Sequence, residues 1–138
     1  MAALSITVAN VLPVTSSTNY NVLTGVAAVA ILQGQSVYRL SDGTIGLADA
    51  NAASPAYTTV GIALAPALTG QIVSYQIAGD LDFGAILTTN VWYVVGSTAG
   101  SINPMSDTAS GWYGAVLGYA ITTSRMRLNI VNTGVALA

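Results

Sequence analysis

The sequence predicts an all-β protein, a compact barrel or sandwich built from two similar β repeats with an extended N-terminal arm. Short motifs recur about 55 residues apart, and no segment shows helical periodicity over three turns. The composition agrees, because Val, Ile, Thr and Tyr are plentiful whereas the helix formers Glu and Lys are absent. A chain of 138 residues has the length of one domain, so the two repeats are expected to pack into a single body.

Four pairs of short motifs carry the repeat. They are Ile31-Leu32 with Ile86-Leu87, Val37-Tyr38-Arg39-Leu40 with Trp92-Tyr93-Val94-Val95, Gly43-Thr44-Ile45 with Gly100-Ser101-Ile102, and Val60-Gly61-Ile62-Ala63 with Leu117-Gly118-Tyr119-Ala120. The first two pairs lie 55 residues apart, the last two 57, and an offset of 55 returns at Gly79 and Gly134. A two-residue insertion in one turn explains the change. The arm is expected to span residues 1–24 and the β domain 25–138, with repeats at about 25–80 and 81–138.

Charged residues make up only 6% of the chain, against roughly 25% in ordinary soluble domains. A surface so poor in charge predicts extensive coverage by protein partners. With three Arg and a net charge of −2, no basic patch for nucleic acid is expected. No membrane is expected either, because the longest apolar run, residues 25–32, is far shorter than the ~20 residues of a spanning helix. The N-terminus also lacks the pattern of a secretory signal.

The arm, residues 1–24, is expected to be extended, with at most one edge strand. A polar run at 15–19 follows an apolar stretch in which Pro13 disfavours a central strand. An apolar arm without its own core commonly lies on a neighbouring subunit, and a frayed terminus is the alternative. The candidate interface residues of the arm are Val11, Leu12, Val14 and Tyr20.

Within the domain, residues 25–31 fit either a buried strand or a short helix. Residues 36–40 and 44–48 are expected to form a hairpin, because Asp42-Gly43 favours the positive φ angles of a tight turn. Gly61 and Gly118 occupy matched positions inside strands, which indicates a bulge or a close backbone approach. Further strands are expected at 58–65, 71–78, 91–95, 101–103, 113–121 and 125–131.

The ionisable residues leave little for catalysis. Without His, Glu, Lys or Cys, the serine and cysteine triads are excluded, and no phosphate-binding glycine loop is present. Asp80 and Asp82 are the only close carboxylates, two apart and on one face of an extended segment. They are expected to form a solvated face in the link between the repeats, with a calcium site or a catalytic pair as alternatives. No enzymatic activity, metal or cofactor is predicted.

Arg125 and Arg127 also lie two apart, so both guanidinium groups leave one face of a strand. Pairing with Asp80 and Asp82, within the chain or across a subunit boundary, suits the bidentate arginine fork. Two unpaired surface arginines are the alternative. These four residues form the second set of candidate interface residues.

The aromatic pairs Trp92-Tyr93 and Trp112-Tyr113 suggest stacking on a sugar ring. Because neighbouring residues in a strand face opposite ways, one member of each pair is expected in the core and the other outside. Core filling and ordinary interface contacts are the simpler interpretation.

Five stretches together carry a resemblance to a known family. They are Gly34-Gln35-Ser36-Val37-Tyr38-Arg39-Leu40, the Asp42-Gly43 turn, Val60-Gly61-Ile62-Ala63, Leu117-Gly118-Tyr119-Ala120 and Leu128-Asn129-Ile130. In these turn and core signatures the chain resembles the small capsid cement or decoration proteins of tailed bacteriophages, over about residues 25–137.

The resemblance implies a homotrimer on the outer surface of the virion, with the major capsid protein as partner. Its implied role is structural, namely to stabilise the assembled head against internal DNA pressure, and it brings no catalytic residues. The alternative is a carbohydrate- or receptor-binding module of a head fibre or tail protein, which would need Trp92 or Trp112 exposed beside polar groups. An enzyme would need Asp80 and Asp82 in a pocket.

Overall fold

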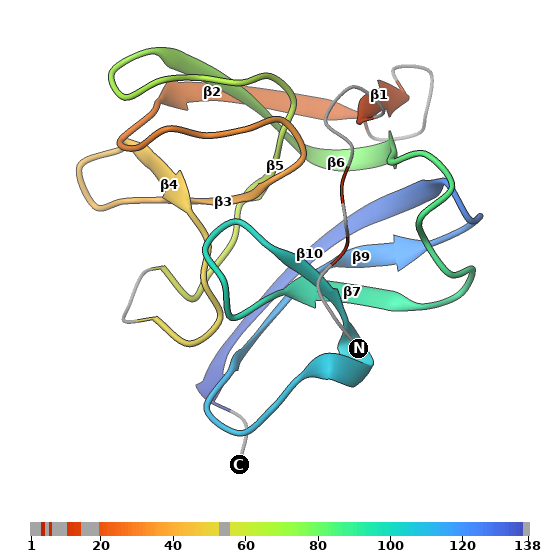
Figure 1. Ribbon diagram of the computed structural model, residues 1–138. Helices are drawn as coiled ribbons and strands as arrows, with labels where there is room; N and C mark the ends of the chain where they lie inside the picture. The colour runs from red at the N-terminus through yellow and green to blue at the C-terminus, as the bar shows by residue number, and fades with distance from the viewer. Residues whose placement is uncertain (1–3, 5, 7–10, 15–19, 53–55, 137–138) are drawn as a thin grey trace.

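The computed structural model describes residues 4, 6, 11–14, 20–52 and 56–136, and their regular structure is almost entirely β (Figure 1). The all-β prediction is confirmed. The elements are β1 Leu12–Val14, β2 Asn21–Val26, β3 Ser36–Arg39, β4 Ile45–Leu47, β5 Gly61–Ala63, β6 Ile72–Asp82, β7 Trp92–Val95, β8 Ile102–Pro104, the short 3-10 helix η2 Met105–Asp107, β9 Tyr113–Ala120 and β10 Arg125–Ala136.

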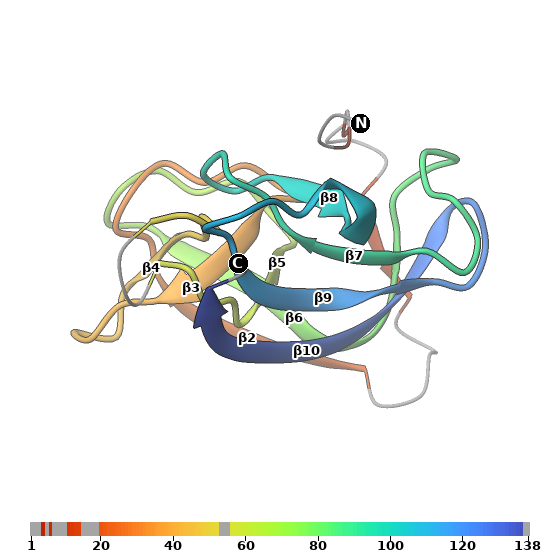
Figure 2. The same ribbon diagram turned by 90° about the horizontal axis from the view of Figure 1, so that it is seen from below.

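These strands form one curled antiparallel sheet (Figure 2). Its order is β4-β3-β5-β6-β10-β9-β7-β8, and β1 and β2 pair with the other edge of β6. Read inward from one end, the order is β4, β3, β5, β6, and read inward from the other end it is β8, β7, β9, β10. The strands β3 to β6 of the first half therefore correspond, in sequence, to β7 to β10 of the second. The repeated sequences thus become two similar half-sheets, joined where β6 pairs with β10. We call this junction the seam.

The pairing register corrects one sequence match. Val37 lies opposite Gly61 in the first half, and Tyr93 lies opposite Gly118 in the second. Tyr93 therefore corresponds to Val37, and not to Tyr38 as the motif comparison suggests. Both side chains are buried, so the shared requirement is an inward apolar group.

The match between Gly79 and Gly134 is not kept by the pairing either. Ile62 lies opposite Gln76, and its counterpart Tyr119 lies opposite Arg127. Gln76 therefore corresponds to Arg127. The pairing of β9 with β10 contains register shifts after Leu128 and after Asn132, so spacing along the sequence and pairing position do not stay in step there.

The core has two parts. One extends over the second half and the seam and includes Ala48, Ala50 and Ile62 of the first half, and the other lies inside the first half. The largest buried side chains of the first part are Phe83, Tyr93, Ile62, Leu81, Leu117, Met126 and Ile102, and those of the second are Tyr75, Ile31 and Ile45.

Part of the expected arm belongs to the sheet of its own chain. β1 pairs with residues 80–82 of β6, and β2 pairs with residues 72–78, so the expected boundary after residue 24 falls inside β2. The backbone amide of Leu4 donates to the Ile102 carbonyl at 2.9 Å. The long strand β6 offers a second edge of unpaired backbone groups, and these segments satisfy it. The rest of the arm, including 15–19, lies outside the described residues.

Of residues 25–31, for which the sequence fits either a strand or a short helix, the first two belong to β2 and residues 27–31 form neither element. β2 ends at Val26, and isolated bridges join Ala27 to Ile45 and Ile31 to Ala67.

The two strand glycines mark close backbone approaches, as predicted. A Cβ at Gly61 would overlap the backbone carbonyl of Gln76, and a Cβ at Gly118 would overlap that of Arg127. Each glycine therefore allows a central strand of its half to approach the adjacent long strand.

The predicted hairpin at Asp42-Gly43 is confirmed, with β3 paired to β4 and Gly43 at a φ of 88°. The Asp42 carboxylate accepts hydrogen bonds from the Thr44 hydroxyl at 2.6 Å and the Thr44 amide at 3.0 Å. The hydroxyl first, and then the amide, lower the pKa of Asp42 below its usual value.

We expect this turn to loosen at acid pH. The pKa of Asp42 is lower in the folded chain than in the unfolded chain. The stability that the ionised Asp42 carboxylate contributes to the fold is therefore fully present above the unfolded pKa and is lost as the pH falls through the folded pKa. An NMR titration of the Thr44 amide should therefore give a midpoint below that of an ordinary Asp. In Thr44→Val the midpoint should rise, and an unchanged midpoint would exclude the hydroxyl as the cause.

Candidate functional site

Four side chains from four adjacent strands stand in one row across the outer face of the seam. Residues directly opposite each other in an antiparallel pair share a face. Asp80 of β6 lies opposite Arg127 of β10, and Arg127 lies opposite Tyr119 of β9. Tyr119 in turn lies opposite Trp92 of β7. We call Asp80, Arg127, Tyr119 and Trp92 the seam row.

The opposite face of the same strands points into the core. One chain neighbour of each seam-row residue is buried, and these neighbours are Leu81, Met126, Ala120 and Tyr93. The alternation of strand side chains therefore fixes the seam row on the outside of the sheet.

An ion pair anchors one end of the row. Arg127 Nε donates to Asp80 Oδ1 at 3.0 Å, and Arg127 Nη2 lies 3.5 Å from Oδ2. Arg125 Nη1 lies 4.0 Å from the same carboxylate. The predicted pairing of these arginines with an aspartate is therefore confirmed within the chain. The Asp80 carboxylate, and after it Tyr119, raise the pKa of Arg127, which stays charged.

The expectation of a solvated Asp80 in a link between repeats is wrong. Asp80 lies within β6, and its side chain is only 5% exposed, whereas that of Arg127 is 51% exposed. β1 on one side and the two arginines on the other cover the carboxylate. Asp80 thus holds the Arg127 guanidinium in one orientation and leaves much of it open to a partner.

A second row lies beside the first. Leu12 of β1 lies opposite Asp82 of β6, and Asp82 lies opposite Arg125 of β10. The Asp82 carboxylate accepts a hydrogen bond from the backbone amide of Gly84 at 2.8 Å. The register therefore gathers on one face six of the residues that the sequence singled out, namely Leu12, Val14, Asp80, Asp82, Arg125 and Arg127.

The other two candidates lie elsewhere. Val11 is fully buried in the core of its own chain, so the prediction that it contacts a partner is wrong. The neighbouring Leu12, which faces the opposite way, is 56% exposed. Tyr20 is half-buried and precedes β2, outside both rows.

The aromatic end of the row is open to solvent. Trp92 is 39% exposed while Tyr93 is buried, as the alternation of this pair predicts. The rings of Trp92 and Tyr119 lie with centroids 4.9 Å apart and planes tilted by 48°. Tyr119 thus adjoins the Arg127 guanidinium, and Trp92 lies one strand further along the row, an arrangement suited to stacking contact with a ligand.

The second aromatic pair does not follow the same alternation. Trp112 and Tyr113 are both half-buried, and Tyr113 stacks on Tyr57 with centroids 3.8 Å apart. Trp112 lies in the turn before β9, where strand alternation does not apply.

A hollow of about 430 Å³ adjoins the seam row. It opens where β6 and β10 diverge beyond the Ala78–Asn129 pair, and residues 77–79 and 127–130 line it. Arg127 and the exposed Asn129 supply its polar side chains. Arg127 therefore stands between the aromatic rings on its β9 side and this hollow on its β6 side.

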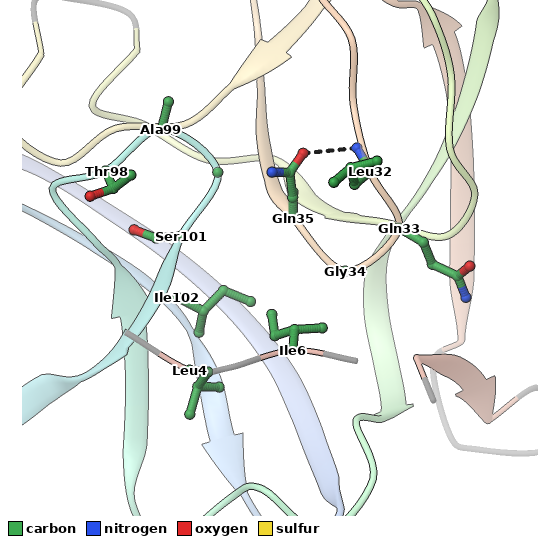
Figure 3. Close-up of a pocket in the computed structure, with 11 residues that line it drawn as sticks. Leu4, Ile6, Leu32, Gln33, Gly34, Gln35, Thr98, Ala99, Ser101 and Ile102 are labelled. Carbon is green, nitrogen blue, oxygen red and sulfur yellow. Dashed lines mark hydrogen bonds between the residues drawn. The ribbon is translucent and has the colours of Figure 1, made fainter. Parts of the chain in front are cut away.

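A second hollow lies where the two halves meet again, away from the seam (Figure 3). It measures about 280 Å³ and lies between residues 32–35 and 98–102, beside Leu4 and Ile6. The Gln35 side-chain oxygen accepts the Leu32 amide at 2.8 Å. The lining contains no ionisable side chain, so this hollow has no group for acid–base chemistry.

The described residues contain no cluster of three metal-binding side chains, and the Asp80–Asp82 segment is engaged by Arg127 and Gly84. No helix in this part of the chain is long and apolar enough to cross a membrane. The seam row itself offers aromatic rings and a guanidinium group on its outer face.

No protein-family model matches the chain, and no curated protein matches it. The function must accordingly be argued from the seam itself. Sequence reasoning missed two of its residues, Tyr119 and Asn129. Strand alternation predicts that each faces away from a buried neighbour, but only the register places them beside Arg127.

Proposed function

We propose that this protein is a non-enzymatic binding protein that attaches through the seam row to the outside of a tailed-phage head and stabilises contacts between major capsid subunits. The observation that carries the proposal is the row of Trp92, half-buried Tyr119 and Arg127 on the outer face of the sheet, in which Asp80 holds Arg127. Trp, Tyr and Arg are the residue types that contribute most binding energy at protein interfaces. Because the ion pair already orients Arg127, less side-chain freedom is lost on docking.

The choice of a phage head as the partner rests on the sequence resemblance and on the composition. A surface with so few charges suits permanent coverage by other proteins. Binding only to the assembled lattice would stabilise that lattice by mass action. Attachment as a homo-oligomer would present several seam rows at once, so that weak contacts add.

Co-sedimentation of the full chain with expanded heads, stripped of accessory proteins, tests this proposal. We expect saturable binding at a fixed ratio to the major capsid protein. A folded chain that stays in the supernatant at concentrations of about 10 μM would contradict it.

A second candidate function is saccharide binding at the same face. It is favoured by the partly exposed Trp92 ring, which packs against Tyr119, while Arg127 and the polar hollow lie further along the same row. A saccharide of more than one ring, stacked on Trp92 and Tyr119, would extend toward the Arg127 guanidinium. A glycan array separates the two candidates, because head attachment predicts no saccharide ligand whereas this candidate predicts a defined one.

A further inference from the structure

Three polar side chains follow one another along the outer face of β10. Arg125, Arg127 and Asn129 alternate with Met126 and Leu128, which are buried, so all three polar side chains leave the same side of the strand. Consecutive members of this series are about 6.8 Å apart along an antiparallel strand. β10 therefore presents hydrogen-bond donors at regular spacing, and we call these three residues the β10 line.

The donors of Arg127 are only partly used within the chain. A guanidinium has more N–H donors than one carboxylate can accept. Asp80 engages the edge that Nε and Nη2 form, with distances of 3.0 and 3.5 Å, and Tyr119 also raises the pKa of Arg127. The Arg127 side chain is nevertheless 51% exposed, so donors outside the Asp80 edge can reach a further acceptor.

Arg125 is less engaged than Arg127. Its Nη1 lies 4.0 Å from Asp80 Oδ2, which is beyond hydrogen-bond distance, and its side chain is 43% exposed. Asp82 lies directly opposite Arg125 on β6, but the Asp82 carboxylate accepts the amide of Gly84. The Arg125 guanidinium is thus held near the seam without a hydrogen bond to Asp80.

The negative charge of this cluster lies deeper than the positive charge. The Asp80 side chain is 5% exposed, far less than either arginine above it, and Asp82 is half-buried. A partner that approaches the outer face therefore meets two guanidinium groups first. The chain has only three Arg and a net charge of −2, so two thirds of its cationic side chains are gathered on this face.

We propose that the β10 line binds carboxylate groups of the partner, with the Arg125 and Arg127 guanidinium groups as donors and the Asn129 amide beside them. The inference rests on the attachment to phage heads proposed above, and it names the chemistry of the partner as Asp or Glu side chains of the major capsid protein. Carboxylates match the planar arginine fork, and exposed positive charge selects a negative partner. Trp92 and Tyr119, at the other end of the seam row, supply the apolar part of the same contact.

NMR of the arginine side chains tests this chemistry on the full chain without heads. Three Arg give three Nε–H signals. Sodium glutarate, a dicarboxylate, should shift the signals of Arg125 and Arg127, whereas sodium chloride at the same ionic strength should not. Arg39 is the internal reference, because it lies on β3 and donates to the Tyr75 hydroxyl at 2.8 Å. Absence of any shift with glutarate, or equal shifts at all three arginines, would overturn the proposal.

Co-sedimentation with heads separates this inference from the proposed function. Arg125→Gln should raise the dissociation constant for heads at least about fivefold and should reduce its dependence on salt concentration. Arg39→Gln removes the same charge from a strand that β5 and β6 separate from β10, so it should bind like the wild-type protein. Circular dichroism should show both variants folded.

The outcomes differ for the two proposals. If heads bind Arg125→Gln and the wild-type protein equally at every salt concentration, the carboxylate proposal is wrong and attachment to heads stands. An equal loss in Arg39→Gln would mean that net charge, and not the β10 line, governs binding, which also contradicts the proposal. If heads bind none of the three folded proteins, the proposed function fails and this inference fails with it.

Discussion

Gly118→Ala is expected to destabilise the fold by about 3 kcal/mol or more, since the added Cβ would overlap the backbone carbonyl of Arg127. Backbone atoms of two paired central strands would have to separate, because no flexible side chain can give way. The seam row would also be disturbed, since Gly118 precedes Tyr119 and faces the strand that carries Arg127. Urea unfolding followed by circular dichroism measures the loss.

The same strand offers a matched control. At Gly114 of β9 an added Cβ would lie 3.0 Å from the Thr133 hydroxyl, which belongs to an exposed side chain that can rotate. Gly114→Ala should therefore cost less than about 1 kcal/mol. Gly61→Ala, in the equivalent place of the first half, should resemble Gly118→Ala. Equal stability of all three variants would mean that the close approaches do not constrain the sheet.

Trp92→Ala is expected to weaken attachment to phage heads by about 30-fold or more, which corresponds to roughly 2 kcal/mol for an interface aromatic. The ring is exposed at the open end of the seam row, where a partner would cover it together with Tyr119. The unfolding midpoint should also fall, because Trp92 is only 39% exposed and its ring packs against Tyr119, so binding is compared at concentrations of folded protein. Co-sedimentation at several protein concentrations gives the change in affinity.

Arg127→Lys extends this test to the polar end of the row. Lys keeps the charge but cannot reproduce the two contacts that the guanidinium makes with Asp80. We expect a smaller loss of binding than for Trp92→Ala. Val131→Ala, an exposed position on β10 outside the row, is the control. If heads bind the wild-type protein and Trp92→Ala with equal affinity, the seam row is not the attachment face. That result would leave the proposal that the protein attaches to heads intact.

Much of the fold was predictable because it depends on local chemistry. The Asp42-Gly43 turn specifies its hairpin through the φ angles that glycine allows, and alternation places one member of the Trp92–Tyr93 pair inside and the other outside. The spacing of Arg125 and Arg127 likewise predicts two guanidinium groups on one face. The repeat indicates two similar halves. These inferences need only a residue and its near neighbours along the chain.

The errors occur where distant segments meet. Residues 12–14 and 21–26 have no core of their own, yet they are strands, because β6 offers them an open edge. Asp80 is buried in a part of β6 that pairs with β1 on one edge and lies beside two arginines on the other. The motif match of Tyr38 with Tyr93 fails because pairing partners, and not side-chain type, define equivalence between the halves.

By itself, then, the sequence determined an all-β chain with matched strand glycines and a set of ionisable residues poor in catalytic groups. Only the tertiary structure decided that Asp80, Arg127, Tyr119 and Trp92 form one row, and that Asp80 lies deeper than the two arginines beside it. The physical reason is register. A shift of one residue turns every side chain of a strand to the opposite face, and cross-strand register depends on bulges and pairings between segments far apart in the chain.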